Sequence, residues 1–572
     1  MKKGMILKIL YLTMFTVFSF VLVMVYAKSG VNKNLQSKQS AASVWKAPKS
    51  ANSVKNPLAG NSIAAHVGKN LFQTYCITCH GDKGEGNGPS AAGLNPKPAN
   101  LVSKQVQKQS DGALFWKITT GKPPMLSWKY TLSKKQRWEV VDYIRELLIP
   151  GKIMAIPSFA RQTNMACSSC HTMFPELNAF GRLFKLNGYT LTGIATVQSR
   201  DKNDNLTLNL LKIPQISAMI QASYTYKSKK QPGTQNNNIA LPQQLSFFLG
   251  GEITPKVGGF IQITYDDQGG AIGIDNSDIR YANQTELASE SFIYGVTLNN
   301  NPTVQDVWNS TPAWSFPYAS SAVAPSPAAA TLIEGDLGQS VAGLGAYGLW
   351  DNLVYGEVSL YRSAQQGAPN PPDSTSEGVI KSLAPYWRFA LQKQFGSNYV
   401  ELGTYGMSAD IYPSGISGLT DKYTDIGFDL NYEKSLGSNM ITAHTNLIHE
   451  TQKFAATLGP DLGNKSNSLN SFKIVGNYYI HSQIGLSLGY FLISGDAVKA
   501  LYSPGSVDGS LNGKPNSNGL IAQFSYEPWL NTKFSVQYVA YSKFNGSSSN
   551  YDGSGRNASD NNTVYVDSWI AF

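Results

Sequence analysis

Cysteine, histidine and charge are all scarce in this sequence. Its 572 residues include four cysteines and six histidines, and 15% of the residues are charged. All four cysteines lie in two short motifs, which leaves none for a structural disulfide. The formal net charge is +10, but no stretch interleaves basic and aromatic residues as a nucleic-acid surface does. We therefore expect no nucleic-acid partner, and we attribute much of the excess charge to a solvated Lys/Ser/Asn-rich stretch near the N-terminus.

Long apolar runs are missing beyond the N-terminus. Residues 1–27 begin with Lys2 and Lys3, continue with an apolar run over 9–25, and end at the small residue Ala27. This pattern predicts a cleaved export signal. Because the run is longer than a typical signal core, an uncleaved anchor is the alternative. No later stretch is long and apolar enough to form a transmembrane helix.

Two segments match the pattern C-x-x-C-H. They are Cys76-Ile-Thr-Cys79-His80 and Cys167-Ser-Ser-Cys170-His171. In this spacing two thiols add across the two vinyl groups of one haem, and the adjacent histidine ligates the iron. Two alternatives are a redox C-x-x-C pair and half of a zinc site. Neither explains why a histidine directly follows the second cysteine in both motifs. A zinc site also usually needs further Cys or His nearby. The sequence therefore predicts two covalently bound haem c groups, with His80 and His171 as iron ligands.

The residues around the first motif follow a recognisable order. A short helical segment, 67–75, runs into the motif, and a glycine-rich loop follows it. A Gly/Pro segment then leads to Met125, and 132–148 is predicted to form a closing helix that Ser133 can cap. Apolar residues recur along that helix at three- and four-residue steps, as a buried face requires. They are Trp138, Val141, Ile144 and Leu148.

This order resembles the class I monohaem cytochromes c across about residues 62–150. The resemblance implies a small α-helical domain with His80 as proximal ligand and Met125 as distal ligand. A thioether opposite histidine raises the reduction potential of a haem. A methionine that only fills the core is the alternative role for Met125. Ligation by Met125 would leave the iron without an open site, and no catalytic His/Arg/Glu group is visible, so a peroxidase is disfavoured.

The second motif has different surroundings. Only about 35 residues separate His171 from the first expected strand, too few to bury a core of their own. We therefore expect this segment to pack against the domain that follows it. Arg182 and Lys185 have two interpretations, as partners of haem propionates or as a solvated basic face. The distal ligand has four candidates, which are Met165, Met173, Met219 and His444.

From about Leu208 onward, short β-type runs alternate with Gly/Asn/Ser/Pro segments. In 425–433, Ile426, Phe428, Leu430 and Tyr432 share one face, and polar residues make the other. Residues 484–492 alternate in the same way, with glycine and serine opposite the apolar positions. A transmembrane barrel needs this pattern, apolar toward lipid and polar or small toward the lumen. A soluble β-sandwich would also show alternation.

The lengths of the connections favour the membrane barrel. Tight turns are expected at 254–257, 350–352, 396–398, 436–439, 481–483 and 527–532, and longer connections at about 229–243, 301–337, 365–382, 411–421, 453–469, 495–517 and 545–561. Short periplasmic turns and long loops on the other side are the outer-membrane arrangement, and our count of about sixteen strands is even, as such barrels require. The last strand ends in Phe572, in which it resembles outer-membrane barrels.

A barrel of this size leaves an aqueous lumen unless something fills it. The second haem segment is the expected plug. Loop 301–337 either folds inward as a constriction or stays flexible. The acidic inward positions Asp425, Asp429 and Glu433 either favour a cation in the lumen or only make the lumen polar.

Residues 159–163, the second haem motif and residues 174–189, followed by a porin-like barrel, resemble the fused cytochrome–porins. That family is associated with the oxidation of extracellular Fe(II), and the resemblance covers about 157–572. Family members usually carry one haem, whereas this chain has an additional cytochrome domain in front. The resemblance implies outer-membrane lipid around the barrel, extracellular Fe(II) or another donor outside, and a periplasmic c-type cytochrome or similar carrier as partner.

The sequence thus predicts a multidomain fold, a small α-helical cytochrome c domain plus a transmembrane antiparallel β-barrel of about 16 strands. The expected divisions are a signal peptide at 1–27, a flexible linker at 28–61, the cytochrome domain at 62–150, the second haem segment and plug at 151–207, and the barrel at 208–572.

The function that follows is a hypothesis. The chain is read as an outer-membrane dihaem cytochrome–porin whose cytochrome domain lies in the periplasm. Electrons pass from an extracellular donor, Fe(II) first among them, through the second haem site and then the first, to a periplasmic carrier. With iron as donor the chain would act as an Fe(II):cytochrome c oxidoreductase. The alternatives are outward electron transfer to an extracellular acceptor, or a solute porin with accessory haems.

Overall fold

The computed structural model describes residues 45–58, 68, 71–72, 74–81, 84–146, 158–163, 167–190, 196–201, 206–211, 215–266, 271–335, 337–459, 463 and 465–572. The predicted signal peptide, most of the predicted linker, and the connection 149–157 lie outside these residues. The chain divides into two compact units, Met1–Lys46 and Ala47–Phe572, and the second is described below.

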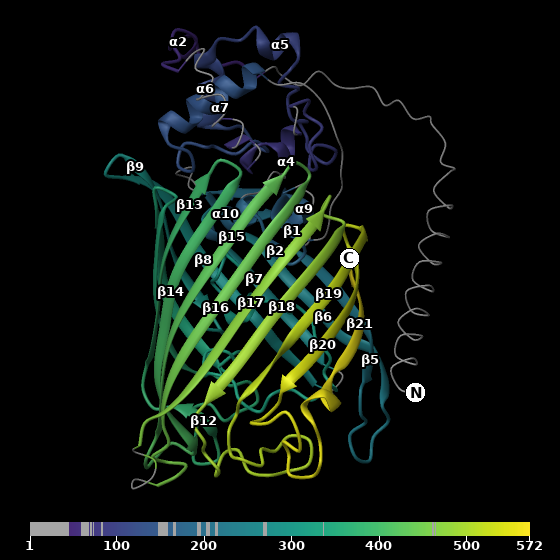
Figure 1. Cartoon of the computed structure of the whole chain (residues 1–572). Helices are drawn as coiled ribbons and strands as arrows, with labels where there is room; N and C mark the ends of the chain where they lie inside the picture. Colours follow the sequence, from purple (N-terminus) through teal and green to yellow (C-terminus); the bar gives the residue numbers. More distant parts are fainter. Residues whose placement is uncertain are drawn as a thin grey trace, which may run out of the picture. The chain divides into compact units, whose positions relative to one another are not determined.

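A closed antiparallel β-barrel dominates the described part of the chain (Figure 1). Sixteen of its strands pair with their neighbours in chain order, and β21 pairs with β5 to close the ring, so the predicted barrel and its strand number are confirmed. The first eight are β5 (Ile216–Lys227), β6 (Asn237–Thr254), β7 (Val257–Asp266), β8 (Ala271–Leu287), β9 (Glu290–Asn299), β10 (Val341–Trp350), β11 (Val354–Ser363) and β13 (Ala384–Phe395). The others are β14 (Asn398–Ser414), β15 (Asp421–Leu436), β16 (Asn439–Lys453), β17 (Asn467–Ile480), β18 (Ile484–Gly495), β19 (Ser517–Trp529), β20 (Thr532–Lys543) and β21 (Thr563–Ala571).

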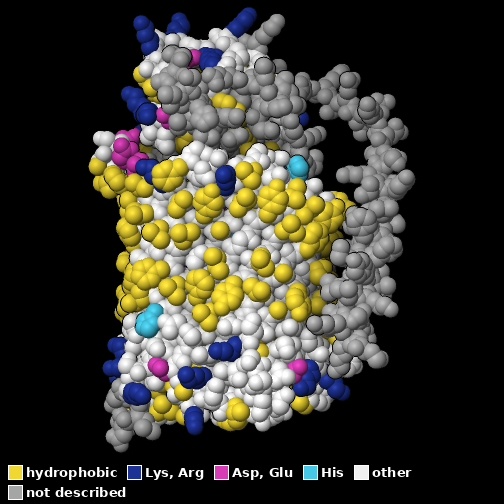
Figure 2. Space-filling view, viewed as in Figure 1, with side chains coloured by type: hydrophobic (Ala, Val, Ile, Leu, Met, Phe, Trp, Pro, Cys, Tyr) yellow, Lys and Arg dark blue, Asp and Glu magenta, His cyan; other side chains and the backbone are white. Residues whose placement is uncertain are grey.

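The barrel turns polar side chains inward and apolar side chains outward. In β15, Asp425 and Asp429 are 1% and 2% exposed, whereas Ile426 and Phe428 are 43% and 53% exposed. Successive strand residues point to opposite faces, so the alternation in sequence becomes two surfaces of opposite character. On the face seen in Figure 2, the outward apolar side chains form a broad band around the barrel. Such an exterior suits an apolar surrounding rather than water.

Short turns and long loops alternate around the barrel, as expected. All six predicted tight turns are found, and residues 288–289 add one that the pattern did not reveal. In the turn between β10 and β11, Asp351 and Asn352 have φ of 50° and 52°. Positive φ at both central residues gives a turn whose twist matches that of antiparallel strands. On the long-loop side, the short strand β12 (Glu377–Ile380) pairs with the end of β14.

The barrel begins later than the expected boundary near Leu208. The run at β4 (Leu206–Leu211) is a strand, but it pairs with β3 (Thr196–Arg200) in a separate two-stranded sheet. The first barrel strand starts at Ile216. Alternation marks a strand without specifying its partner, so the sequence pattern placed this run in the barrel.

The N-terminal part of the described unit is helical, as predicted. Its helices are α2 (Lys49–Asn52), α4 (Ile77–His80), α5 (Lys104–Gln107), α6 (Asp111–Thr120) and α7 (Lys134–Glu146). The Ser133 hydroxyl accepts the Gln136 backbone N–H at 3.2 Å, and Gln136 Oε1 accepts the Ser133 N–H at 2.8 Å. This reciprocal cap explains where α7 begins. Trp138, Val141 and Ile144 are buried as expected.

A short segment between this domain and the barrel wall lies inside the barrel. It comprises α8 (Ser158–Thr163), α9 (Cys167–Cys170), β1 (His171–Met173), β2 (Glu176–Leu177) and α10 (Ala179–Leu186). Every residue of α10 from Phe180 to Leu186 is buried, including its charged residues. We call the described residues within 158–190 the plug segment. Within the described residues, no helix is long and apolar enough to cross a membrane.

Candidate haem sites and the filled lumen

The first C-x-x-C-H motif forms one helical turn. The backbone N–H of His80 donates to the Cys76 carbonyl at 2.8 Å, and the Cys79 N–H donates to the same oxygen at 3.2 Å. Residues three apart on a helix share a face, so this turn presents both thiols on one side. Neither cysteine is in a disulfide.

His80 is prepared to ligate a metal through Nε2. Its Nδ1 lies 3.1 Å from the Ala99 carbonyl oxygen. Because a carbonyl can only accept, Nδ1 carries the proton and Nε2 keeps its lone pair. Burial lowers the pKa of His80, which favours the neutral ring that binds iron. A histidine ligand held by a backbone carbonyl is a common arrangement in metal sites, so these residues fit a haem c.

The glycine-rich loop closes tightly over the motif. Gly88 donates its N–H to the Cys79 carbonyl at 3.1 Å, and Gly86 donates to the His80 carbonyl at 2.8 Å. A Cβ on Gly88 would lie 2.2 Å from the Ile77 carbonyl oxygen. Only glycine allows this approach, so the loop after the motif is shaped by contact with it.

Met125 lies in a tight turn of the same domain. Its backbone exchanges hydrogen bonds with Lys122, at 2.8 and 2.9 Å. The side chain is partly buried and packs against the hydrophobic cluster that Cys76 and Cys79 also contact. This position agrees with the predicted role, and ligation by Met125 stays a prediction.

The second motif has the same chemistry on a different scaffold. Cys167 and Cys170 lie at the two ends of α9, and His171 follows in β1. His171 Nδ1 donates to the Pro175 carbonyl at 3.0 Å, which again leaves Nε2 for a metal. Burial lowers the pKa of His171 to about 4, so the ring is neutral at physiological pH. These residues also fit a haem c, which stays a prediction for this motif.

The candidates for a distal ligand at the second motif lie apart. The Met173 sulfur lies against Gly485 of β18, and Met219 is 2% exposed on β5. His444 on β16 lies 3.3 Å from the Glu176 carboxylate, measured from Nε2. Met165 lies outside the described residues. The distal ligand stays open among them.

The solvated-face interpretation of Arg182 and Lys185 is wrong, because both side chains are buried. Pairing with haem propionates stays a prediction, and each side chain also has protein partners. Arg182 forms a two-pronged ion pair with Glu433 of β15, and its guanidinium stacks 4.3 Å from the Tyr399 ring centre. Lys185 Nζ donates to the carbonyls of Val304 and Asp306, at 2.6 and 2.8 Å. A buried charge needs such partners.

Loop 301–337 folds into the lumen, which resolves the alternative left open by its sequence. Trp308 is 1% exposed, and its indole N–H donates to the Tyr399 hydroxyl at 2.7 Å. Ser310 Oγ donates to Asp429 at 2.5 Å, and the Ile333 N–H donates to Asp425 at 2.9 Å. The acidic inward positions therefore bind the plug segment and this loop, which favours a structural role over cation attraction.

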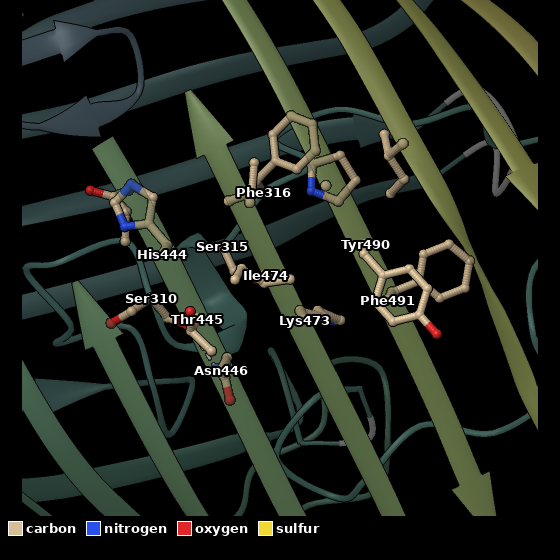
Figure 3. Close-up of a pocket in the computed structure, with 15 residues that line it drawn as sticks. Ser310, Ser315, Phe316, His444, Thr445, Asn446, Lys473, Ile474, Tyr490 and Phe491 are labelled. Carbon is tan, nitrogen blue, oxygen red and sulfur yellow. Dashed lines mark hydrogen bonds between the residues drawn. The ribbon is translucent and has the colours of Figure 1, made fainter. Parts of the chain in front are cut away.

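A small pocket lies beside the loop. Figure 3 shows a pocket in which Ser310 and Phe316 of the loop lie against His444 and Lys473 of the wall. Its cavity volume is about 80 Å³, enough for a few water molecules. Asn446 also reaches the loop, where its amide donates to the Ser310 carbonyl at 2.6 Å.

Sequence reasoning missed the network that holds β2 in the lumen. Glu176 is 2% exposed, and it accepts hydrogen bonds from the hydroxyls of Tyr479 and Tyr318, at 2.7 and 3.3 Å. The His444 ring nitrogen Nε2 contacts the same carboxylate. The one available signal was an acidic residue inside an otherwise apolar segment five residues after the haem histidine.

Among the described residues, three polar contacts join the helical domain to the plug segment and the short turns. The hydroxyls of Ser90 and Ser169 are hydrogen-bonded. The Asn352 amide, in the turn between β10 and β11, donates to the Tyr75 hydroxyl at 3.1 Å. Lys129 forms an ion pair of 3.2 Å with Glu286 near the turn between β8 and β9. The helical domain thus contacts the short-turn end of the barrel.

The described residues thus combine a small helical domain that carries one C-x-x-C-H motif with a closed barrel and the segment that carries the other. Residues 64–144 match the family described as cytochrome C oxidase, cbb3-type, subunit III. The chain therefore carries a cytochrome c domain there, which implies a covalently bound haem c. No curated protein matches the chain.

Solved porin structures resemble the barrel weakly. The anion-selective porin from Comamonas acidovorans is 11% identical with a TM-score of 0.39, and OmpF of Salmonella typhi in complex with daunomycin is 12% identical with a TM-score of 0.37. OmpT of Vibrio cholerae lacking loop L8 is 9% identical with a TM-score of 0.36. Each match covers 62% of this chain, and 98%, 97% and 98% of those chains in the same order. Similarity at this level does not establish the fold. The assignment of a barrel is based on the strand pairing of this chain.

Proposed function

We propose that this chain is an outer-membrane dihaem electron conduit. The observation that carries the proposal is the place of the second haem motif. Its segment is fixed inside a closed barrel by the buried Arg182–Glu433 ion pair and by the hydrogen bonds of Lys185. The exterior of the barrel is apolar, as expected for a wall in contact with lipid. A redox group held there is enclosed by the barrel rather than lying beside it.

The residues of the two motifs supply attachment and orientation. A haem c held at each motif would carry a single electron at a time. The backbone carbonyls of Ala99 and Pro175 set the orientation of His80 and His171. The apolar belt of an outer-membrane barrel is about 25 Å tall, a poor medium for one long tunnelling step. A redox site inside the lumen shortens that step.

The short turns support a periplasmic position for the cytochrome domain. Outer-membrane barrels place their short turns in the periplasm. The cytochrome domain contacts two of those turns, through the Tyr75–Asn352 hydrogen bond and the Lys129–Glu286 ion pair. We therefore place this domain in the periplasm, where a soluble c-type cytochrome or similar carrier takes the electron.

The filled lumen supports electron transfer over solute transport. The plug segment and loop 301–337 occupy the interior that an open porin would leave to water. Hydrogen bonds to buried wall residues hold both elements, among them Asp429 and Tyr399. A solute would have to displace them, whereas an electron needs no open channel.

Fe(II) is the proposed donor, on the strength of the resemblance to the fused cytochrome–porins. The reaction transfers one electron from each Fe(II), which becomes Fe(III), and no proton is required. In the test, oxidised protein in detergent is mixed with Fe(II) under anoxia, and the haem absorbance is followed. Reduction of both haems is expected.

The matched control for this test is the variant Cys167→Ser/Cys170→Ser, which lacks the second attachment site. We expect Fe(II) to leave its remaining haem oxidised, while dithionite still reduces it. Reduction of the wild type by dithionite but not by Fe(II) would remove iron as the donor. The conduit would then need another donor or outward flow.

A further inference from the structure

We propose that the two C-x-x-C-H motifs form one dihaem unit, joined through a direct contact between Ser90 and Ser169. The inference rests on the proposed function, and it specifies how the electron leaves the barrel. The cytochrome domain is then a fixed part of the conduit rather than a tethered carrier that moves.

Ser90 belongs structurally to the first motif. Its backbone N–H donates to the carbonyl of Thr78, the residue between Ile77 and Cys79, at 2.8 Å. The loop from Gly81 to Ser90 therefore returns to the motif and ends on it. Ser90 is 2% exposed, although it lies on a hydrophilic loop of a small domain. A part of the chain outside this loop therefore covers the Ser90 side chain.

Ser169 belongs to the second motif directly, since it precedes Cys170 in the helical turn α9. It is 0% exposed, and its hydroxyl is hydrogen-bonded to the Ser90 hydroxyl. Ser168, the other residue between the two cysteines, is less buried and uses its carbonyl to accept the Asn178 amide at 3.2 Å. The two positions of the motif thus differ, and only Ser169 faces the cytochrome domain.

The surroundings of the thiols support the same contact. Cys76, Cys79 and Cys170 pack against one continuous hydrophobic cluster, to which both the cytochrome domain and the plug segment contribute.

The contact is reinforced on the barrel side. The Tyr75 hydroxyl, next to Cys76 in the chain, accepts a hydrogen bond from Asn352. The Lys129–Glu286 ion pair lies at a second turn. The first motif is therefore held against the mouth of the barrel from more than one direction.

A haem c is bonded to its motif through the cysteine sulfurs, so two motifs in contact bring two haems close. With a haem c held at each motif by its cysteines and histidine, the second haem would be oxidised as the first is reduced, one electron would pass, and no proton would move. Ser90 and Ser169 act as positioning residues, because they set the separation of the sites and take no part in the redox change.

The test measures the magnetic interaction between the two ferric irons, and it needs no electron donor. Electron paramagnetic resonance spectra are recorded for the oxidised full-length protein and for two single-haem variants, Cys76→Ser/Cys79→Ser and Cys167→Ser/Cys170→Ser. We expect the wild-type spectrum to differ from the sum of the two single-haem spectra, because nearby ferric irons interact. The variant Ser90→Arg, whose side chain cannot fit at a 2% exposed position, is expected to lose this difference.

The matched control is Ser103→Arg, on the same domain but partly exposed, where the hydroxyl is bonded only to nearby residues, the carbonyl of Asn100 and the N–H of Val106. It should keep the wild-type spectrum. Retention of the first haem's absorbance in Ser90→Arg shows that the domain still folds. A wild-type spectrum equal to the sum would overturn the junction, even if Fe(II) reduces both haems. Magnetic interaction without reduction by Fe(II) would retain the junction and reject the proposed donor.

Discussion

Replacing Glu433 by glutamine would remove the negative charge that balances Arg182 inside the barrel. The two side chains are 9% and 5% exposed, and two nitrogens of the guanidinium face the two carboxylate oxygens. Removing one partner of a buried ion pair costs about 3–5 kcal/mol, because the other charge stays buried without compensation. The substitution destabilises the state in which the plug segment lies in the lumen. The released state is not destabilised, because Arg182 is then hydrated.

The effect on plug release can be estimated from that cost. Each ~1.4 kcal/mol changes an equilibrium tenfold, so the ratio of released to seated plug should rise by roughly two to three orders of magnitude. The lower part of the range applies because glutamine still accepts one hydrogen bond. Lys185, bonded to Val304 and Asp306, and Tyr189, bonded to Asp278, still hold the segment. We therefore expect rare openings rather than an open pore.

Single-channel recording in planar bilayers measures this ratio. The wild type is expected to stay closed, and Glu433→Gln should show brief openings of porin size. Glu357→Gln is the matched control, because Glu357 is buried in the same lumen but bonds to Tyr355 and Ser359 of its own strand. Equal conductance in Glu433→Gln and Glu357→Gln would refute the anchoring role of the ion pair.

Three further predictions concern the haem sites. Met125→Leu should lower the reduction potential of the first haem in a spectroelectrochemical titration, with Met407→Leu in the barrel as control; an unchanged potential would assign the distal position to another ligand. His171→Ala should convert one of the two haems to a high-spin spectrum and leave the other reducible by dithionite, whereas an unaltered spectrum would mean that His171 is not a ligand. Pyridine haemochrome analysis should find about two haems per chain in the wild type and one in Cys167→Ser/Cys170→Ser; one haem in both would remove the second site.

The architecture was predictable wherever a short-range pattern carries the information. The two-residue period of β15 predicted which side chains face inward, and Asp425 and Phe428 lie on the expected sides. The reciprocal cap of Ser133 and Gln136 explains why the start of α7 could be placed. Tight turns were also recognisable, since their residues tolerate positive φ.

Long-range pairing was not predictable in the same way. Arg182 and Glu433 are 251 positions apart, and nothing near Arg182 in the chain indicates its partner. The strand Leu206–Leu211 alternates like its neighbours, yet it pairs outside the barrel. Loop 301–337 folds inward because Asp425, Asp429 and Tyr399 offer partners from distant strands. Such choices depend on which surfaces meet, and a single sequence does not contain that information locally.

The same limit applies to the two haem motifs. Each motif was visible on its own, with the histidine that follows the second cysteine. Their contact through Ser90 and Ser169 was not visible, because serine on a loop ordinarily faces water. The burial of both hydroxyls is the feature that only the folded chain reveals.

Electron transfer across a sealed bilayer tests the central claim most directly. The protein is inserted into liposomes that enclose an oxidised soluble c-type cytochrome, Fe(II) is added outside under anoxia, and reduction of the enclosed cytochrome is followed optically. The account predicts reduction in vesicles with the wild type, and none with Cys167→Ser/Cys170→Ser or in empty vesicles. Equal reduction with and without the second haem site would contradict it.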